Sequence, residues 1–235
     1  MKYSAYTNVG GRNNNEDYFE AVRANGCCLF VLCDGLGGLD AGEVASETAA
    51  AEIKDQFLFD PKGFELKQAV LAANERILMK QKESGKNMKT TVTAVYIADG
   101  EIYCSHVGDS RIYMFDEGGI CYQSVDHSAS QMAVFSGEIT PDGIRTHPDR
   151  NILTNALGAY NKLNAEVKSF SADKIKAVLM CSDGFWEYVY EDEMVKLLNE
   201  SQEPSEWIVS MRALLGQRIG KKNDNNTAVA VFLKN

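Results

Sequence analysis

Four aspartates of this sequence stand where segments of β-strand composition begin or end: Asp34, Asp109, Asp183 and Asp224. Aspartate followed by glycine or asparagine is also common in tight turns, so each one alone is compatible with a turn role. Four such carboxylates converging on one sheet edge would repel each other unless a cation held them. Hard oxygen ligands of this kind suit Mg²⁺ or Mn²⁺. The recurring placement therefore favours a divalent metal site.

The first of these acids lies in a glycine-rich stretch, FVLCDGLGGLDAGEVAS, between a predicted strand and a predicted helix. Such a stretch suggests a nucleotide loop, a metal platform or only a tight turn. A P-loop needs a lysine after its glycines, and no lysine occurs between Val22 and Ile53. A dinucleotide-binding fingerprint would need glycine where Asp40 stands, and a haloacid-dehalogenase-type phosphatase would need a second aspartate in place of Leu36. These absences favour the metal platform.

The N-terminal segment GGRNNNEDYF adds one cation and two acids. Alone, it is compatible with a solvated polar loop. Beside a carboxylate-bound metal, Arg12 would hold a phosphate through two parallel hydrogen bonds. Glu16 and Asp17 would orient metal-bound waters. The three histidines, at positions 106, 127 and 147, lack a metal-binding spacing, which disfavours zinc.

The elements that must position these residues form an α+β pattern. Apolar stripes predict amphipathic helices near residues 45–57, 66–77 and 204–219. Very short polar turns, such as Asp99-Gly100, indicate antiparallel neighbours in an expected meander of four strands. The strands are predicted at residues 28–33, 91–98, 101–107, 111–115, 120–125, 176–181 and 227–233. Antiparallel strands with helices outside them predict layered α+β architecture.

We expect one domain over residues 1–235, because this length fits a single core. Residues 128–165 are weakly periodic and contain Gly137, Pro141, Gly143 and Pro148. A loop-rich segment of that length inside a domain is often a lid or binding flap. We therefore predict a flap-like insertion at about residues 128–165.

Composition limits the partners and the compartment. The chain is 45% hydrophobic and 24% charged, as in ordinary globular proteins, and its net charge of −9 argues against nonspecific binding to nucleic acid or anionic membrane. The six cysteines include no C-x-x-C pair, so we expect buried, reduced thiols in a cytoplasmic protein. The N-terminus lacks the apolar region of a signal peptide, and no apolar run is long enough to span a membrane.

Eight ordered motifs, which extend from Arg12 to Val231, strengthen the metal interpretation. They are GGRNNNEDYF, LCDGLGGLDAGEVAS, KTTVTAV, HVGDSRIYMF, DHS, LTNALG, CSDGFWE and DNNTAVAV. In this order and spacing the sequence resembles the metal-dependent protein phosphatases of type 2C (the PPM family), especially their compact bacterial members. The resemblance implies an α-β-β-α sandwich with two central antiparallel sheets. It also implies hydrolysis of phosphoserine and phosphothreonine by direct attack of a metal-bridging hydroxide.

The resemblance further implies a ligand set. Two Mn²⁺ or Mg²⁺ ions would be held by Asp34, the Gly35 carbonyl, Asp183 and Asp224, and Asp17 would act mainly through bound water. Asp109, with Asp183, would bind a third, weaker ion. Arg12 would hold the phosphate, while Glu16 and Asn225 would support the ligands from outside. The implied substrates are phosphorylated proteins, the targets of a cognate kinase in signalling.

Two departures concern the general acid. Many eukaryotic members carry a histidine where this chain has Leu36, and many bacterial members carry one where it has Leu39. His147 is a candidate for protonating the leaving group, and water is another. A catalytically silent pseudophosphatase that binds phosphoproteins is the alternative function, and hydrolysis of small phosphoesters is a third. The presence of Asp34, Asp183 and Asp224 favours an active enzyme.

Overall fold

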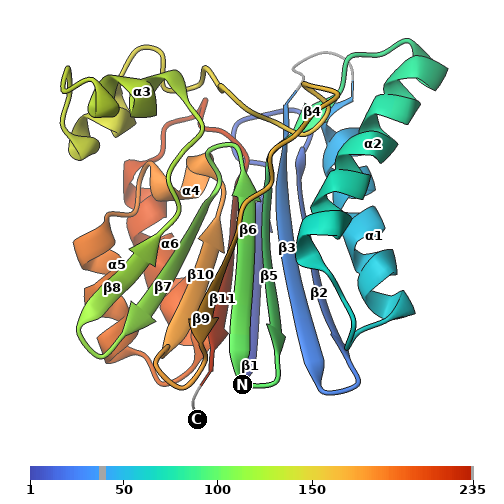
Figure 1. Ribbon diagram of the computed structural model, residues 1–235. Coiled ribbons are helices and arrows are strands. Elements are labelled where there is room, and N and C mark those ends of the chain that lie inside the picture. The colour runs from blue at the N-terminus through green and yellow to red at the C-terminus, as the bar shows by residue number, and fades with distance from the viewer. Residues whose placement is uncertain (37–40, 234–235) are drawn as a thin grey trace.

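A computed structural model describes residues 1–36 and 41–233. It consists of two antiparallel sheets packed face to face between helices (Figure 1), which confirms the predicted four-layer sandwich. The five-stranded sheet has the order β1 (Lys2–Asn8), β11 (Asn226–Phe232), β10 (Ala177–Cys181), β7 (Arg111–Asp116) and β8 (Gly119–Gln123). The six-stranded sheet has the order β2 (Asp17–Ala24), β3 (Cys27–Leu36), β5 (Val92–Ala98), β6 (Glu101–Val107) and β9 (Val167–Ser171), with β4 (Lys89–Thr90) added to β3.

The inner faces of the two sheets form the central core. Because successive side chains of a strand point to opposite faces, alternate residues of each inner strand enter this layer. Phe30 and Leu32 of β3 contribute from one sheet, and Val178 and Met180 of β10 contribute from the other. All four are at most 3% exposed. This layer fixes the two sheets against each other, so that residues at the sheet edges keep a constant spacing.

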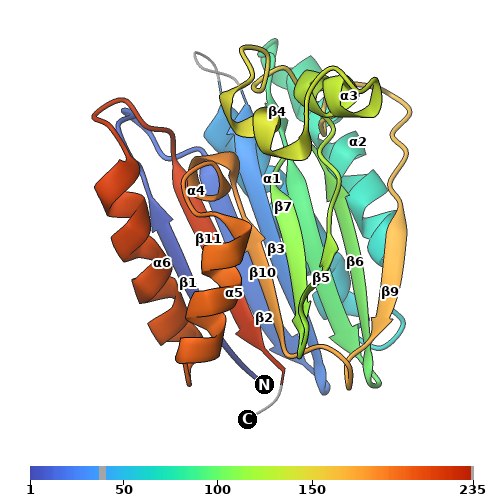
Figure 2. The same cartoon turned by 90° about the vertical axis from the view of Figure 1, so that its left-hand side faces the viewer.

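Two helical pairs cover the outer faces (Figures 1 and 2). The helices α1 (Gly42–Phe59) and α2 (Leu66–Ser84) pack on the six-stranded sheet, and α5 (Glu191–Glu200) and α6 (Pro204–Arg218) pack on the five-stranded sheet. The predicted stripes are the buried faces of three of them: Ala45, Ala49, Ile53 and Phe57 of α1, Leu66, Val70, Ala73 and Ile77 of α2, and Trp207, Ile208, Met211 and Leu215 of α6.

The predicted four-strand meander is wrong. The turns at Asp99-Gly100 and at residues 117–118 do join antiparallel neighbours, but the pair β5–β6 belongs to one sheet and the pair β7–β8 to the other. The chain crosses between the sheets at residues 108–110, in the sequence GDS. This crossing places Asp109 between the two sheets rather than at a simple hairpin end.

Apart from the two-residue β4, three strands had no counterpart in the prediction: β1, β2 and β9. Each is mostly half-buried or exposed along its length, and each carries charged or polar side chains. Without a clear apolar alternation, their sequences lack the pattern from which strands are recognised. Their pairing with β11, β3 and β6 supplies the backbone hydrogen bonds that keep them in the sheets.

The segment 128–165 contains a short helix, α3 (Ala129–Phe135), and a 3₁₀ helix, η1 (Pro141–Thr146). Ser128 caps α3, because its Oγ accepts a hydrogen bond from the N–H of Gln131 at 3.2 Å. Figure 2 shows α3 beyond the upper ends of the strands, on the same side of the molecule as β4.

All six cysteines are free; Cys121 is exposed and the other five are buried. The prediction of buried thiols therefore fails only at Cys121, which lies on the edge strand β8. In the part of the chain that the structure describes, no helix is both long and apolar enough to cross a membrane.

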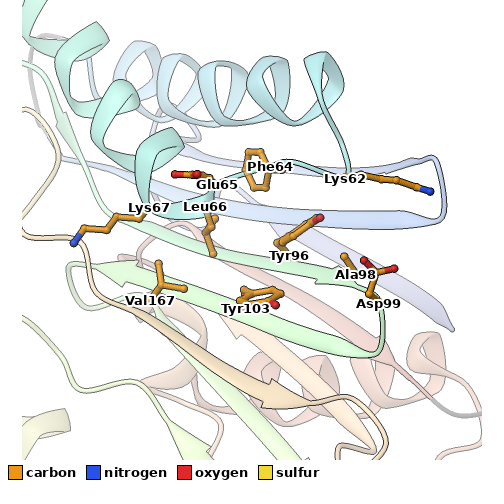
Figure 3. A pocket seen from close by; sticks show the side chains of 10 residues that line it. All are labelled: Lys62, Phe64, Glu65, Leu66, Lys67, Tyr96, Ala98, Asp99, Tyr103 and Val167. Atoms are coloured by element: carbon orange, nitrogen blue, oxygen red, sulfur yellow. The ribbon is translucent and has the colours of Figure 1, made fainter.

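A cavity of about 400 Å³ opens where α2 begins over β5 and β6 (Figure 3). Phe64, Tyr96 and Tyr103 point into it, and the ring centroids of Tyr96 and Tyr103 are 5.7 Å apart. Tyr96 pairs with Leu29, five residues before Asp34 on β3, which corresponds to about 16 Å along the strand. The cavity is therefore separate from the predicted metal site.

Candidate metal centre

Asp17 and Asp34 face each other across the pair β2–β3, where they are register partners. Asp34 lies inside β3 rather than after it, so the predicted strand end at Cys33 is wrong. The strand continues because Gly35 pairs with Thr90 in β4. Thr91 holds the Asp34 backbone from both sides: its Oγ1 accepts the Asp34 N–H at 3.0 Å, and its own N–H donates to the Asp34 carbonyl at 2.8 Å.

Asp183 and Asp224 come from the other sheet. Asp183 is the first residue of α4 (Asp183–Trp186), directly after β10, and Asp224 precedes β11. Ser182 connects this sheet to the first pair of acids. Its Oγ donates to Asp17 Oδ2 at 2.8 Å and accepts the Thr227 N–H at 3.0 Å. A single hydroxyl thus ties the ends of β10 and β11 to the beginning of β2.

Asp109 is brought to the same region by the crossing between β6 and β7. It is 5% exposed, and its backbone carbonyl accepts a hydrogen bond from Trp186 Nε1 at 2.9 Å. Trp186 lies on α4 together with Asp183, so the two acid-bearing segments touch through this side chain.

The N-terminal loop is fixed by Asn225. Its Nδ2 donates to the carbonyls of Val9 and Asn14 at 2.8 and 2.9 Å, and its Oδ1 accepts the Glu16 N–H at 2.8 Å. The Glu16 carbonyl in turn accepts the Gly35 N–H at 3.0 Å. This network places the loop that carries Glu16 beside Gly35 of β3.

Arg12 lies on the rim of the site, where its Nη2 is 2.5 Å from Asp224 Oδ2. Its side chain is 53% exposed, which leaves the guanidinium open to solvent. Burial alone would lower the pKa of Arg12, but the negative charges of Asp224 and Asp183 outweigh it and raise that pKa. The arginine therefore remains a permanent cation beside the acids.

Two glycines that follow acids are required by close backbone contacts. A Cβ added to Gly35 would lie 2.3 Å from the Gly42 carbonyl oxygen at the start of α1. A Cβ added to Gly184 would lie 2.1 Å from the Asn225 carbonyl oxygen. Such distances are far below van der Waals contact, so any larger residue would push apart the segments that carry the acids. The two Asp-Gly pairs are therefore packing requirements as well as turns.

The electrostatics of the cluster show acids whose pKa values are raised by burial and by one another's charge. Burial raises the pKa of Asp17 to about 6, against hydrogen bonds from Thr227 and Ser182 that lower it. Burial and the charge of Asp126 raise the pKa of Asp109 to about 7.

For the other two acids of the centre the upward shift is larger. Burial raises the pKa of Asp34 well above its usual range, and the charges of Asp17, Asp183, Asp109 and Asp224 add to this effect. Burial and the charge of Asp109 do the same for the pKa of Asp183. Five aspartates that were distant in sequence thus act on one another electrostatically.

The donor set fits a hard divalent cation. Asp17 Oδ1 and Asp183 Oδ1 are buried, and within the described residues neither has a hydrogen-bond partner. Buried carboxylate oxygens without partners are costly unless a cation binds them. Among those same residues, no group of three or more acidic, histidine or cysteine side chains is arranged so that it could hold a metal ion by itself. An ion bound here would therefore keep several water ligands, as Mg²⁺ and Mn²⁺ do.

Of the residues that bear on the general acid, the structure describes Leu36 and His147. Leu36 is half-buried at the end of β3, opposite Lys89, and Leu39 lies outside the described residues. His147 follows η1, and its Nδ1 accepts the N–H of Asp149 at 3.1 Å. One nitrogen of this imidazole is therefore engaged within the segment 128–165.

Sequence reasoning missed the neutral residues that hold the acids: Thr91, Ser182, Trp186 and Thr227. Each occurs inside one of the eight motifs, and all but Thr91 share that motif with a predicted acid. The available signal was a hydroxyl or an indole N–H placed among otherwise apolar strand residues, because such a group needs a partner when it is buried.

Comparison with known proteins assigns the chain and its fold to a family. The protein phosphatase 2C sequence profile matches residues 8–216. A serine/threonine phosphatase of Listeria welshimeri, stp, is 30% identical over 187 residues, which cover 76% of this chain and 74% of that protein.

Solved structures agree along nearly the whole chain. The serine/threonine phosphatase Stp1 from Staphylococcus aureus is 27% identical with a TM-score of 0.88, covering 100% of this chain and 96% of that one. The catalytic domain of the serine/threonine phosphatase PstP, solved in complex with two manganese ions, is 29% identical with a TM-score of 0.84, covering 97% and 96%. This chain belongs to the protein phosphatase 2C family.

Proposed function

We propose that this chain is a Mn²⁺- or Mg²⁺-dependent protein phosphatase that hydrolyses phosphoserine and phosphothreonine. The observation that carries the proposal is that the charges of four aspartates from both sheets act on Asp34. Arg12 lies on the rim of this cluster, and the chain belongs to a phosphatase family. Its relatives include named serine/threonine phosphatases, and one of them was solved with two manganese ions. The same pair of ions, Mn²⁺ or Mg²⁺, is the cofactor proposed here.

The ligand roles proposed for this cluster are those that the family resemblance implies. We assign one pair of ions to Asp34, the Gly35 carbonyl, Asp183 and Asp224, with Asp17 acting through bound water. A third, weaker ion is assigned to Asp109 and Asp183. When bound, such ions lower the pKa of a water molecule, so that hydroxide is available near neutral pH, and they neutralise charge on the phosphoryl oxygens.

The protein side chains orient and hold the reactants. Thr91 and Ser182 fix Asp34 and Asp17 by the hydrogen bonds described above, which keeps the acids in place before the substrate arrives. Arg12 presents its solvent-exposed fork to a phosphate at the rim. Glu16 and Asn225 support the loop that carries Arg12. The segment 128–165 is proposed as the flap that contacts the substrate protein.

We also propose a cellular setting. The expected substrates are phosphorylated proteins made by a cognate kinase, and the expected compartment is the cytoplasm. The net charge of −9 supports a protein that does not bind nucleic acid or anionic membrane. The role that follows is the removal of phosphate signals from serine and threonine side chains.

The reaction is tested with three peptides of identical sequence that carry phosphoserine, phosphothreonine or phosphotyrosine. With Mn²⁺ present, the chain is expected to release phosphate from the first two. A folded protein that binds the phosphopeptides and releases nothing would contradict the enzyme and support the pseudophosphatase alternative. A protein that hydrolyses only small phosphoesters would contradict the protein-substrate assignment.

Replacing Arg12 by alanine is expected to lower kcat/KM for a phosphothreonine peptide by about 10- to 100-fold, chiefly through KM. The reason is the loss of charge-assisted hydrogen bonds to the phosphate. Steady-state kinetics measure the change. Arg12→Lys should recover only part of it, because an ammonium group lacks the planar fork. Arg76→Ala, an exposed change on α2, is the control, and an effect of equal size there would refute the role of Arg12.

A further inference from the structure

Trp186 connects the two segments that carry Asp109 and Asp183. The side chain is 2% exposed, and its Nε1 donates to the Asp109 carbonyl oxygen at 2.9 Å. It lies three residues after Asp183, on the same four-residue helix α4. One indole therefore fixes the distance between the end of β6 and the end of β10, which belong to different sheets.

This connection opposes a repulsion. Among the neighbouring charges that raise the pKa of Asp183, that of Asp109 has the largest effect, ahead of those of Asp224 and Glu187. Without an ion, like charges in a buried region drive such carboxylates apart. Because the indole binds the backbone carbonyl of Asp109 and not its carboxylate, the bond leaves the carboxylate oxygens available to an ion.

The indole itself is held firmly. The Arg111 guanidinium carbon lies 3.5 Å from the ring centroid, and Arg111 is the first residue of β7, two residues after Asp109. Asp126 fixes this guanidinium with two hydrogen bonds of 2.8 and 2.7 Å. From η1, Arg145 approaches the ring at 5.4 Å. A stacked, paired guanidinium beneath the ring gives the N–H a fixed direction.

We propose that Trp186 is a positioning residue that holds Asp109 and Asp183 at the spacing needed to share one divalent ion. The inference rests on the proposed function, which assigns the weakest ion to these two acids. The tighter pair of ions shares Asp183 but is also held by Asp34, the Gly35 carbonyl and Asp224. Trp186 touches none of these three in the hydrogen bonds and ring contacts found among the described residues.

The chain offers a matched control for a substitution. Trp207 is the other tryptophan, it is fully buried, and its Nε1 donates to the Met194 carbonyl at 3.0 Å, within the α5–α6 pair. Trp186→Phe and Trp207→Phe each remove one indole N–H bond of the same kind and keep a buried ring. Only the first concerns the acids.

Binding of Mn²⁺ to the full chain is measured by electron paramagnetic resonance, without any assay of activity. We expect Trp186→Phe to weaken the lowest-affinity Mn²⁺ by about 10- to 100-fold and to leave the tighter ions unchanged. Trp207→Phe should bind as the wild type does. In an Asp109→Asn background, Trp186→Phe should have no further effect on Mn²⁺ binding, because both changes act on the same ion.

An unchanged isotherm for Trp186→Phe, or equal losses in both tryptophan variants, would overturn the inference. A wild-type chain that binds no Mn²⁺ would instead overturn the proposed function, so the two failures are distinguishable.

A second measurement uses the unaltered protein in case Trp186→Phe does not fold. With two tryptophans, the ¹⁵N-labelled chain has two indole N–H signals. On addition of Mg²⁺, the Trp186 signal should shift over the concentration range of the weakest ion, and the Trp207 signal should not. A Trp186 signal that stays fixed across this range would contradict the positioning role.

Discussion

Asp34→Asn is expected to lower kcat by about 10³-fold or more while the protein remains folded. Asp34 stands at the centre of the cluster, where the charges of four other aspartates act on it. An amide keeps the size of the side chain but removes its negative charge, so the two divalent ions are held less well. Their contribution to transition-state stabilisation, about several kcal/mol, is then lost. Phosphate release from a phosphothreonine peptide in excess Mn²⁺ measures the effect.

The same substitution is expected to leave the Tm of the metal-free protein equal to or above that of the wild type. The pKa of Asp34 is raised in the folded state, so the folded protein binds its proton more tightly than the unfolded chain does. The free energy of unfolding therefore falls as the pH rises from about 4, the pKa of an aspartate in the unfolded chain, toward the pKa of Asp34 in the folded protein. At pH 7, above the ordinary pKa of an aspartate, Asp34 therefore lowers the stability of the folded protein, and the amide removes this cost.

The control for this substitution is Asp99→Asn, at an exposed turn next to Gly100. It should change neither kcat nor Mn²⁺ binding. Two results would contradict the role of Asp34: full turnover in Asp34→Asn, or a drop of its metal-free Tm large enough to show that the carboxylate is needed for folding.

Asp126→Ala is expected to have the largest effect on stability, a loss of about 3–5 kcal/mol in the free energy of unfolding. Asp126 is 4% exposed and binds Arg111, which is 3% exposed, through two parallel hydrogen bonds. Removing the carboxylate leaves a buried guanidinium whose other carboxylate partner, Glu191, is 3.3 Å away. The loss follows from the uncompensated buried charge rather than from the strength of the pair itself.

Urea unfolding monitored by circular dichroism measures this loss. Lys2→Ala is the comparison, because it removes an ion pair with Glu203 whose side chains are 53% and 40% exposed. Solvent screens such a pair, so we expect its removal to cost less than about 1 kcal/mol. Similar losses in the two variants would contradict the account of the buried network.

The acids and the helices were predictable because their patterns are local. A carboxylate followed by glycine after an apolar run is visible in sequence at Asp34 and Asp183, and so is the apolar stripe of α2. The sheet to which each strand belongs was not predictable in this way. The crossing at Gly108 and Asp109 has the short, polar composition of a hairpin turn, yet it joins two different sheets.

The partners of the acids depend on contacts between distant segments. Ser182 meets Asp17 across 165 residues, and Trp186 meets Asp109 across 77. No local sequence pattern predicts which carbonyl an indole N–H will bind, because the packing of the two sheets determines the partner. The family resemblance implied a ligand set, whereas the residues that hold these proposed ligands in place became visible only in three dimensions.

The central claim is that hydrolysis of the phosphate ester depends on divalent ions held by these buried aspartates. Phosphate release from a phosphothreonine peptide by the wild-type chain tests it most directly, first after removal of metal with a chelator and then after addition of excess Mn²⁺. We predict no turnover in the chelated protein and recovery of turnover with Mn²⁺ while the fold stays the same. Equal turnover in the metal-free protein, or none in the folded protein with Mn²⁺, would contradict the claim.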